Sequence, residues 1–152
     1  MSVQAVKEFF RAKEKEVPIL IFEDTSTVAK AAEALGVTPG EIAKSLLLQV
    51  QDGFVMVLMA GDKRLDNRKF KDTFRAKPKM PEVDQVLEVT GHPVGGVCPF
   101  GLKENIPVYL DESLKRYTKI YPAAGAPNAA VELAVNELEE LVVSDWVDVT
   151  QG

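Results

Sequence analysis

The run Phe54–Ala60 is apolar at every position and shows no alternation of apolar and polar residues. A strand with one face in water alternates, so an unbroken apolar run indicates a strand that is buried on both faces. Gln51-Asp52-Gly53 separates this run from a second one, Ser45–Val50, and a turn of this kind predicts a β-hairpin. The second strand of this hairpin therefore needs other elements against both of its faces.

The remaining segments predict an irregular alternation of helices and strands. Helical periodicity or capping residues mark the ranges 3–14, 29–35, 39–44, 65–74, 81–88 and 137–141, and short apolar runs predict strands at 17–22, 106–110, 119–121, 129–134 and 146–149. Asp24–Ser26 and Asn136 are the expected N-caps of two of these helices. The 152 residues contain no repeat and no linker, so we expect one mixed α/β (α+β) domain over residues 1–152 with a partly antiparallel sheet.

Charge is unevenly distributed along the chain. The net charge is −5, but Asp62–Lys79 holds eight basic and three acidic residues, which gives this segment +5 and leaves −10 for the remainder. A basic patch on an acidic body suits one local contact with a polyanion, because phosphate neutralisation supplies affinity locally. A solvated helix face explains the same pattern, and charge alone favours that alternative.

The chain has few residues for metal or nucleophilic chemistry. His92 and Cys98 are the only histidine and the only cysteine, so an internal disulfide is impossible, and a zinc site, which needs four ligands, is not expected. A lone cysteine is more often a small buried hydrophobe than a nucleophile. We therefore expect no metal, no cofactor and no catalytic triad.

The segment Thr90–Gly101 contains four glycines and two prolines. Such a composition fixes unusual backbone angles and can bring bare amides against a carbonyl, an oxyanion or a phosphate. A tight connection between a helix and a strand is the alternative. The apolar residues Val94, Val97 and Phe100 within the loop favour a site.

Two further residues are candidates on weaker grounds. Lys44 precedes a run of leucines, where its ammonium can anchor an anion at the mouth of a pocket. The alternative, which the residues alone favour, is that Lys44 complements the dipole at the end of a helix. Asn128, in the turn Gly125–Asn128, either closes an Asx-turn or points into a cleft.

Three segments occur in order along the chain: Glu41–Leu48, Gly91–Gly101 and Gly125–Asn128. A fourth, Gly61–Asp66, precedes the predicted helix over 65–74, which lies in the basic segment. Together they resemble the YbaK/ProX superfamily, the free-standing relatives of the editing domain inserted in bacterial prolyl-tRNA synthetase. The similarity spans roughly Val17 to Val149. It implies a barrel-like mixed sheet flanked by helices, and an aminoacyl-tRNA deacylase that acts in trans.

The resemblance also implies roles for individual residues. Lys44 is expected to bind near the terminal adenosine and its phosphate, and the Gly-x-x-x-Pro motif from Gly95 to Pro99 to position the aminoacyl carbonyl through backbone amides. Within and around this site, the residues expected to contact substrate are Ser45, Gly96, Val97, Cys98 and Asn128. The basic segment fits an acceptor stem, with contacts from Lys63, Arg64, Arg68 and Lys69.

Substrate identity is less constrained than the family. Ser45 stands where some alanine-clearing members have asparagine, so we expect a small or medium amino acid, on a proline tRNA, with water or the substrate 2′-OH as the attacking group. The competing hypothesis is a non-catalytic tRNA- or nucleotide-binding module that acts with a synthetase. A small-molecule hydrolase would need a nucleophile that neither His92 nor Cys98 provides. With charge interrupting the N-terminal residues and no run of about 20 apolar residues, we expect a cytoplasmic protein with no membrane or DNA partner.

Overall fold

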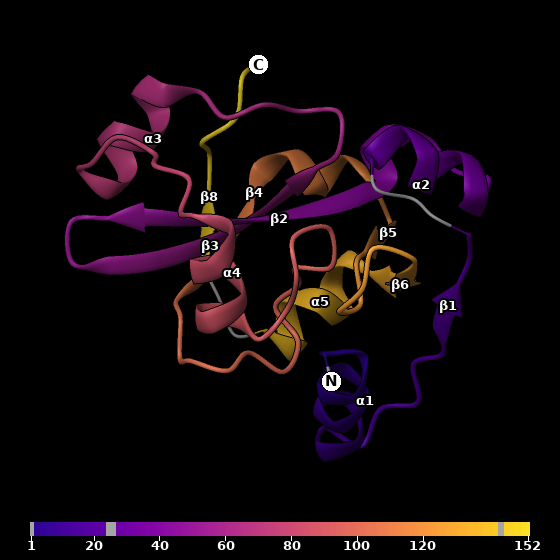
Figure 1. The fold of residues 1–152 in the computed structure, drawn as a ribbon. Coiled ribbons are helices and arrows are strands. Elements are labelled where there is room, and N and C mark those ends of the chain that lie inside the picture. Colours follow the sequence, from indigo (N-terminus) through magenta and orange to yellow (C-terminus); the bar gives the residue numbers. More distant parts are fainter. Residues whose placement is uncertain (1, 24–26, 143–144) are drawn as a thin grey trace.

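The computed structural model describes residues 2–23, 27–142 and 145–152. A six-stranded sheet has the order β7-β5-β2-β3-β4-β8, and β2 (Ile42–Val50) and β3 (Gly53–Ala60) form the long antiparallel hairpin at its centre (Figure 1). Residues 55–60 of β3 are all buried, as the unbroken apolar run predicts. Alternate side chains of β3 enter two separate cores: Met56 and Leu58 pack in the larger one, and Val57 and Met59 in the smaller one.

The outer strands make the sheet mixed, as predicted. β4 (Val108–Asp111) runs parallel to β3, β8 (Asp145–Val147) runs parallel to β4, and β5 (Lys119–Pro122) runs parallel to β2. The predicted single strand over 129–134 is instead two strands. β6 (Ala129–Val131) pairs with β1 (Ile19–Ile21), whereas β7 (Leu133–Ala134) pairs with β5, so the chain changes partner at Glu132.

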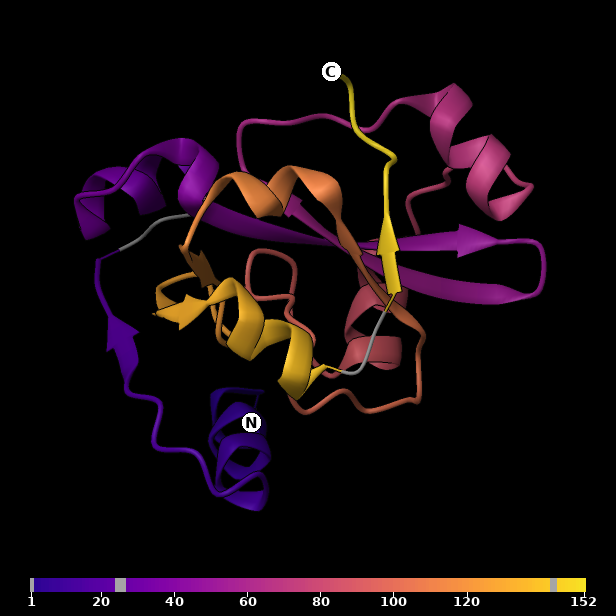
Figure 2. The ribbon, with the colours of Figure 1, turned by 180° about the vertical axis from the view of Figure 1, so that it is seen from behind.

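Helices cover both faces of the hairpin. α1 (Ser2–Ala12), α4 (Val83–Thr90) and α5 (Val135–Leu141) lie on one side of it in both views (Figure 1, Figure 2) and contribute to the larger core. α3 (Asn67–Phe74) closes the other face through Phe70, in the smaller core. α2 (Val28–Leu35) ends at Gly36 in a left-handed cap, as predicted. The 3-10 turn η2 (Glu112–Arg116) follows β4.

Three local predictions differ from the structure. The helix expected over 39–44 is only the 3-10 turn η1 (Pro39–Glu41), because the residues after it are drawn into the central sheet as β2. Asn136 is not the cap of α5, because this helix begins one residue earlier, at Val135. Ala134 is at the cap position, and its amide donates to the Glu137 carboxylate. The caps expected at 24–26 lie outside the described residues, and Thr27 caps α2. No helix in the described part of the chain is long and apolar enough to cross a membrane.

Candidate active site

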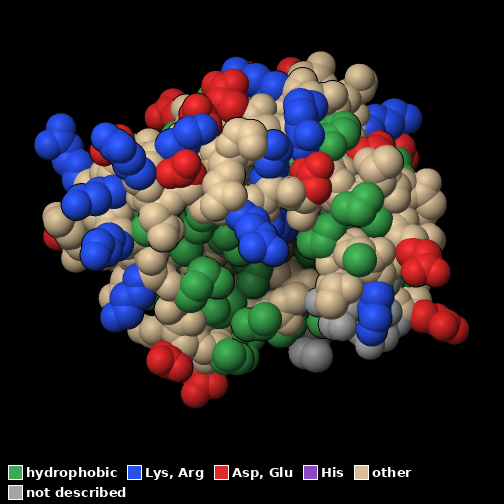
Figure 3. Space-filling model, turned by 90° about the horizontal axis from the view of Figure 1, so that it is seen from above, with side chains coloured by type: hydrophobic (Ala, Val, Ile, Leu, Met, Phe, Trp, Pro, Cys, Tyr) green, Lys and Arg blue, Asp and Glu red, His purple; other side chains and the backbone are tan. Residues whose placement is uncertain are grey.

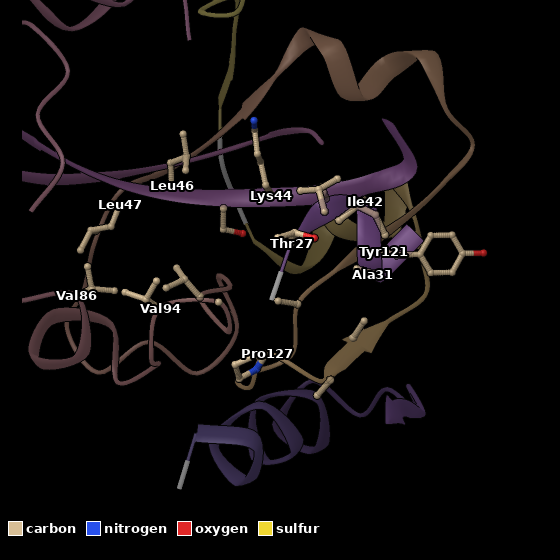
Figure 4. Close-up of a pocket in the computed structure, with 18 of the residues that line it drawn as sticks. Thr27, Ala31, Ile42, Lys44, Leu46, Leu47, Val86, Val94, Tyr121 and Pro127 are labelled. Carbon is tan, nitrogen blue, oxygen red and sulfur yellow. The ribbon is translucent and has the colours of Figure 1, made fainter. Parts of the chain in front are cut away.

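A pocket of about 250 Å³ opens beside β2. Its walls come from β2, α2, the ends of β5 and β6, and the 93–97 loop after α4 (Figure 4). Most of the lining is apolar, including Ala31, Leu47, Val86, Val94 and Pro127. Figure 3 shows a hollow floored by hydrophobic side chains, with Lys and Arg side chains gathered toward the side on which α3 lies. An apolar pocket with a few polar groups in its walls suits a small apolar or weakly polar ligand group.

The pocket exists because β2 separates from β5. Their pairing ends at Ala43, which lies opposite Pro122, and the next contact on that edge is the amide of Gln49, which donates to the carbonyl of Lys79 at 2.8 Å. Among the described residues, no other strand covers the edge of β2 between these two points. Residues 43–47 all line the pocket, so this wall of the pocket is a strand edge.

Lys44 and Ser45 lie on opposite faces of β2, since neighbouring residues of a strand alternate. Figure 4 shows Lys44 pointing away from Val94 and Pro127. The Lys44 ammonium donates to the backbone carbonyl of Lys63, in the loop that precedes α3. Lys44 is on a strand and not at a helix end, so the predicted interaction with a helix dipole is wrong.

The electrostatics of Lys44 reflect this position. Burial lowers the pKa of its ammonium, and the nearby Arg64 guanidinium lowers it further, while Asp62 opposes both. Asp62 is itself paired with Arg116 at 2.7 Å. The ammonium is thus a fixed cation between the pocket and the basic segment, where a phosphate would be the preferred counter-ion.

Ser45 faces the other way, on the same side of β2 as Leu47, which points toward Val86 in Figure 4. Its Oγ is buried and has no hydrogen-bond partner among the described residues. A buried hydroxyl without a partner costs about 1–3 kcal/mol. An unpaired hydroxyl in the wall of a pocket indicates a place where a ligand atom completes the bonding.

The 93–97 loop and the 124–127 loop are hydrogen-bonded to each other on the side of the pocket opposite β2. The Gly96 amide donates to Pro93 O at 2.9 Å, and the Gly125 amide donates to Gly96 O at 3.0 Å. A Cβ on Gly96 would lie 2.5 Å from the nitrogen of Ala126, so only glycine allows this approach. Gly95, with φ +94°, and Val97 line the pocket, and in the described part of the chain no hydrogen bond uses their amides. Both residues therefore combine a place in the pocket wall with an amide that has no protein acceptor among the described residues.

The other residues of the motif are structural in position. Cys98 and Pro99 are buried, and neither belongs to the pocket lining. Burial raises the pKa of the Cys98 thiol to about 12, so the thiol stays protonated at neutral pH. His92 is buried beside it, with Nε2 at 2.8 Å from Phe100 O, and burial lowers its pKa. This neutral pair supports the loop from the core side.

The structure separates the remaining predicted residues. Asn128 is exposed, outside the pocket lining, and its carbonyl accepts the Phe22 amide at 3.0 Å. Arg64 and Arg68 are exposed on the basic side. Lys69 is tied to the C-terminal segment, with its ammonium 3.1 Å from Asp148 and 2.8 Å from Thr150 O. The roles assigned to these residues remain predictions.

Comparison with known proteins then places the fold. The family model of the aminoacyl-tRNA editing domain matches residues 23–141. The chain belongs to this family. It is 44% identical over 152 residues to the uncharacterised protein YwhH of Bacillus subtilis, covering 98% of this chain and 97% of that protein. It is 30% identical over 138 residues to EbsC of Enterococcus faecalis, named as a candidate Cys-tRNA(Pro)/Cys-tRNA(Cys) deacylase, covering 90% of this chain and 84% of that protein.

Larger proteins and solved structures agree with this assignment. A proline–tRNA ligase of Thermosipho melanesiensis is 31% identical over 142 residues, which cover 93% of this chain but only 25% of the ligase. The crystal structure of a candidate trans-editing enzyme for prolyl tRNA synthetase superposes with a TM-score of 0.93 at 29% identity, covering 99% of this chain and 98% of that one. The expected family, mixed fold and activity class, hydrolysis of the aminoacyl-tRNA ester, are therefore confirmed.

Sequence reasoning missed one side of the site. Thr27, the cap of α2, and Val28 and Ala31 within that helix had no local signal for a place in the site. The same holds for Tyr121 on β5, because all of these residues reach the pocket only through long-range packing. The free edge of β2 was equally invisible, since it depends on where another strand stops.

Proposed function

We propose that this chain is a trans-editing deacylase that clears a small or medium non-cognate amino acid from proline tRNA in the cytoplasm, with all 152 residues forming one editing domain. The pocket between β2 and the 93–97 loop, with Lys44 on its basic side, is the observation that carries this proposal. The names of EbsC and of the trans-editing enzyme support the choice of proline tRNA, as do the proline–tRNA ligases among its relatives.

The geometry suggests how the aminoacyl end binds. Lys44 and the exposed Arg64 lie on the side of β2 where a terminal phosphate would approach, and the amino acid passes over the strand edge toward Ser45. The free amides of Gly95 and Val97 then supply donors for the ester carbonyl, while Gly96 and Pro99 hold the loop in shape. Donors of this kind stabilise the negative charge that develops on the carbonyl oxygen.

Hydrolysis needs few catalytic groups beyond these hydrogen-bond donors. The oxygen of water, or of the ribose 2′-OH, attacks the ester carbonyl carbon, and the electron pair of the C=O bond moves to its oxygen. Collapse of this intermediate breaks the bond to the ribose oxygen, which leaves with a proton. Direct attack by water gives free amino acid and deacylated tRNA, and attack by the 2′-OH first gives an isomeric ester that water then cleaves. Positioning of a labile ester contributes much of the acceleration.

The pocket volume bears on the choice of amino acid. A mostly apolar cavity of about 250 Å³ has room for a small or medium side chain. Discrimination between two side chains that both fit is weak, since one methylene is worth only about 1–3 kcal/mol. We therefore propose a group of related substrates and not a single amino acid.

Contacts to the tRNA body are assigned to the basic segment. Lys63, Arg64, Arg68 and Lys69 lie on the loop and helix that border the Lys44 side of the site. Phosphate contacts of this kind supply affinity without reading the amino acid. We include in this proposal, as a further partner, a synthetase that binds the same tRNA.

The test is a deacylation panel. Proline tRNA charged with alanine, cysteine, serine, threonine or a bulkier residue is incubated with wild type and with Lys44→Ala. Charged alanine, serine and threonine tRNAs are included to test whether another tRNA is the substrate. Hydrolysis of a small group of esters, lost in Lys44→Ala with the fold intact, is the expected result. No hydrolysis of any ester would refute the proposal and favour a binding module.

A further inference from the structure

The free edge of β2 presents to the pocket peptide groups that have no partner in the described part of the chain. Gln49 donates its N–H away from β3, to Lys79 O. On the partner strand, Met56 N donates to Pro107 O at 2.9 Å and Ala60 N donates to Ser113 Oγ at 3.1 Å, so these residues also bond away from β2. Met56 lies opposite Leu47, and Ala60 lies opposite Ala43.

These bonds define the direction of every peptide group in β2. Antiparallel pairs alternate between those that bond to each other and those that bond outward. Leu47 and Ala43 belong to the outward set, so Ser45 between them does too. Its N–H and its C=O therefore both point to the edge that β5 and Lys79 leave open.

Ser45 thus presents three polar groups that have no partner among the described residues in one wall of an apolar pocket: an N–H, a C=O and the buried Oγ. Buried backbone groups are almost always paired. A strand edge in this condition is a template for a partner that has its own donor and acceptor at the spacing of a peptide. The α-ammonium and the ester carbonyl of an aminoacyl group have this spacing, because they flank one Cα as in a peptide residue.

We propose that the aminoacyl group binds to the edge of β2 as a one-residue strand. Its α-ammonium donates to the carbonyl of Ser45, and its ester carbonyl oxygen accepts the N–H of Ser45. Ser45 Oγ gives the ammonium a second acceptor. This assignment rests on the proposed deacylase function and specifies which part of the substrate is recognised.

Two consequences follow from this mode of binding. The ester carbonyl is held between the Ser45 amide on one wall and the amides of Gly95 and Val97 on the other, so donors reach it from two sides. The side chain of the substrate makes none of these bonds and faces the apolar walls. Recognition therefore requires an α-amino group and tolerates several side chains of suitable size.

The test pairs one enzyme variant with one substrate change. Ser45→Pro removes the N–H of Ser45, which makes no bond within the hairpin, whereas Ser45→Ala keeps that N–H and removes only Oγ. The substrates are the aminoacyl-tRNA that the enzyme clears best and its α-hydroxyacyl counterpart, made by nitrous acid deamination. Single-turnover rates are divided by the spontaneous hydrolysis rate of each ester.

We expect wild type to prefer the aminoacyl ester by about 10-fold or more, the size of one hydrogen bond to a charged group. Ser45→Pro should lose at least about tenfold in rate on the aminoacyl ester, by loss of the carbonyl contact, and Ser45→Ala should lose less. Circular dichroism checks that each variant is folded. If Ser45→Pro is not, an amide-to-ester replacement at residue 45 removes the same N–H with the side chain kept.

Equal normalised rates for the two esters in wild type, or a folded Ser45→Pro with the wild-type rate, would overturn this inference alone. Absence of hydrolysis of either ester by wild type would overturn the deacylase function and this inference with it.

Discussion

Replacing Gly96 by alanine tests whether the two site loops depend on their close contact. The new Cβ would lie 2.5 Å from Ala126 N and 2.6 Å from the carbonyl carbon of Gly125. Both neighbours are backbone atoms, which cannot rotate away, so the 93–97 loop and the 124–127 loop must separate. Separation also breaks the 3.0 Å bond from the Gly125 amide to Gly96 O.

The magnitude follows from these two effects. Overpacking costs about 1–3 kcal/mol and a lost hydrogen bond about 1 kcal/mol, so Gly96→Ala should lower the free energy of unfolding by about 2–4 kcal/mol. A domain of this size shifts by about 2–4 °C per kcal/mol, which predicts a fall in Tm of about 4–16 °C. Deacylation should fall as well, because Gly95 and Val97 move with the loop.

Two measurements are made on separate samples. Urea unfolding gives the free energy of unfolding, and single-turnover deacylation is measured at a temperature where the variant is folded. Gly36→Ala is the matched control. Gly36 has φ +70°, and a Cβ added to it would meet nothing within 4 Å, so alanine there costs about 1–2 kcal/mol of backbone strain and leaves activity unchanged. A Gly96→Ala protein with wild-type stability and rate would refute the described packing of the loops.

Four further predictions concern the site and the packing of the fold. Cys98 should react slowly with iodoacetamide at pH 8 in the native protein and rapidly in denaturant, and folded Cys98→Ser should retain most activity; rapid native labelling would contradict the burial of this thiol. Burial raises the pKa of the Cys98 thiol to about 12 in the folded protein, so the difference in Tm between wild type and Cys98→Ser should not change with pH below about 8.5. Between about pH 8.5 and 12, the Tm of wild type should fall relative to that of Cys98→Ser, because the unfolded thiol loses its proton first. Arg64→Ala and Arg68→Ala should each weaken tRNA binding and lower the slope of log affinity against log salt by about 1, whereas Lys7→Ala on α1 should not; unchanged slopes would exclude these arginines from the interface. Asp111, fully buried, accepts bonds from the amides of Ser113 and Val149 and the hydroxyl of Thr150, so Asp111→Ala should cost about 3 kcal/mol or more in urea unfolding, against less than about 1 kcal/mol for the exposed Asp148→Ala; equal costs would contradict this bonding.

Local chemistry explains which parts of the fold could be predicted from sequence. The hairpin, α2 with its Gly36 cap, and the burial of Phe54–Ala60 depend on residue patterns within each segment, and the structure agrees except that the first residues of β3 are only half-buried. The helix expected up to Lys44 failed because the capping residues Thr38 and Glu41 support a single turn, after which pairing with β3 determines the conformation. Capping motifs report where a helix starts and not how far it continues.

The site was predicted unevenly for a related reason. Lys44, Ser45, Gly95 and Val97 line the pocket, and their segments were chosen from sequence. Their spatial relation was not predictable, because the opposite orientation of Lys44 and Ser45 requires a strand that was expected to begin only after Lys44. The open edge of β2 depends on β5 ending its pairing at Ala43, which no local pattern encodes.

The most direct test of the central claim is to locate the aminoacyl end on the protein. An adenosine whose 3′-amino group carries an amino acid in amide linkage mimics the substrate and is not hydrolysed. Titrated into isotope-labelled protein and followed by NMR, it should shift the amide resonances of Ser45, Leu47, Gly95 and Val97 together, with little change at the exposed Asn128. Saturable binding that leaves those four amides unshifted would contradict the assignment of this pocket as the site of deacylation.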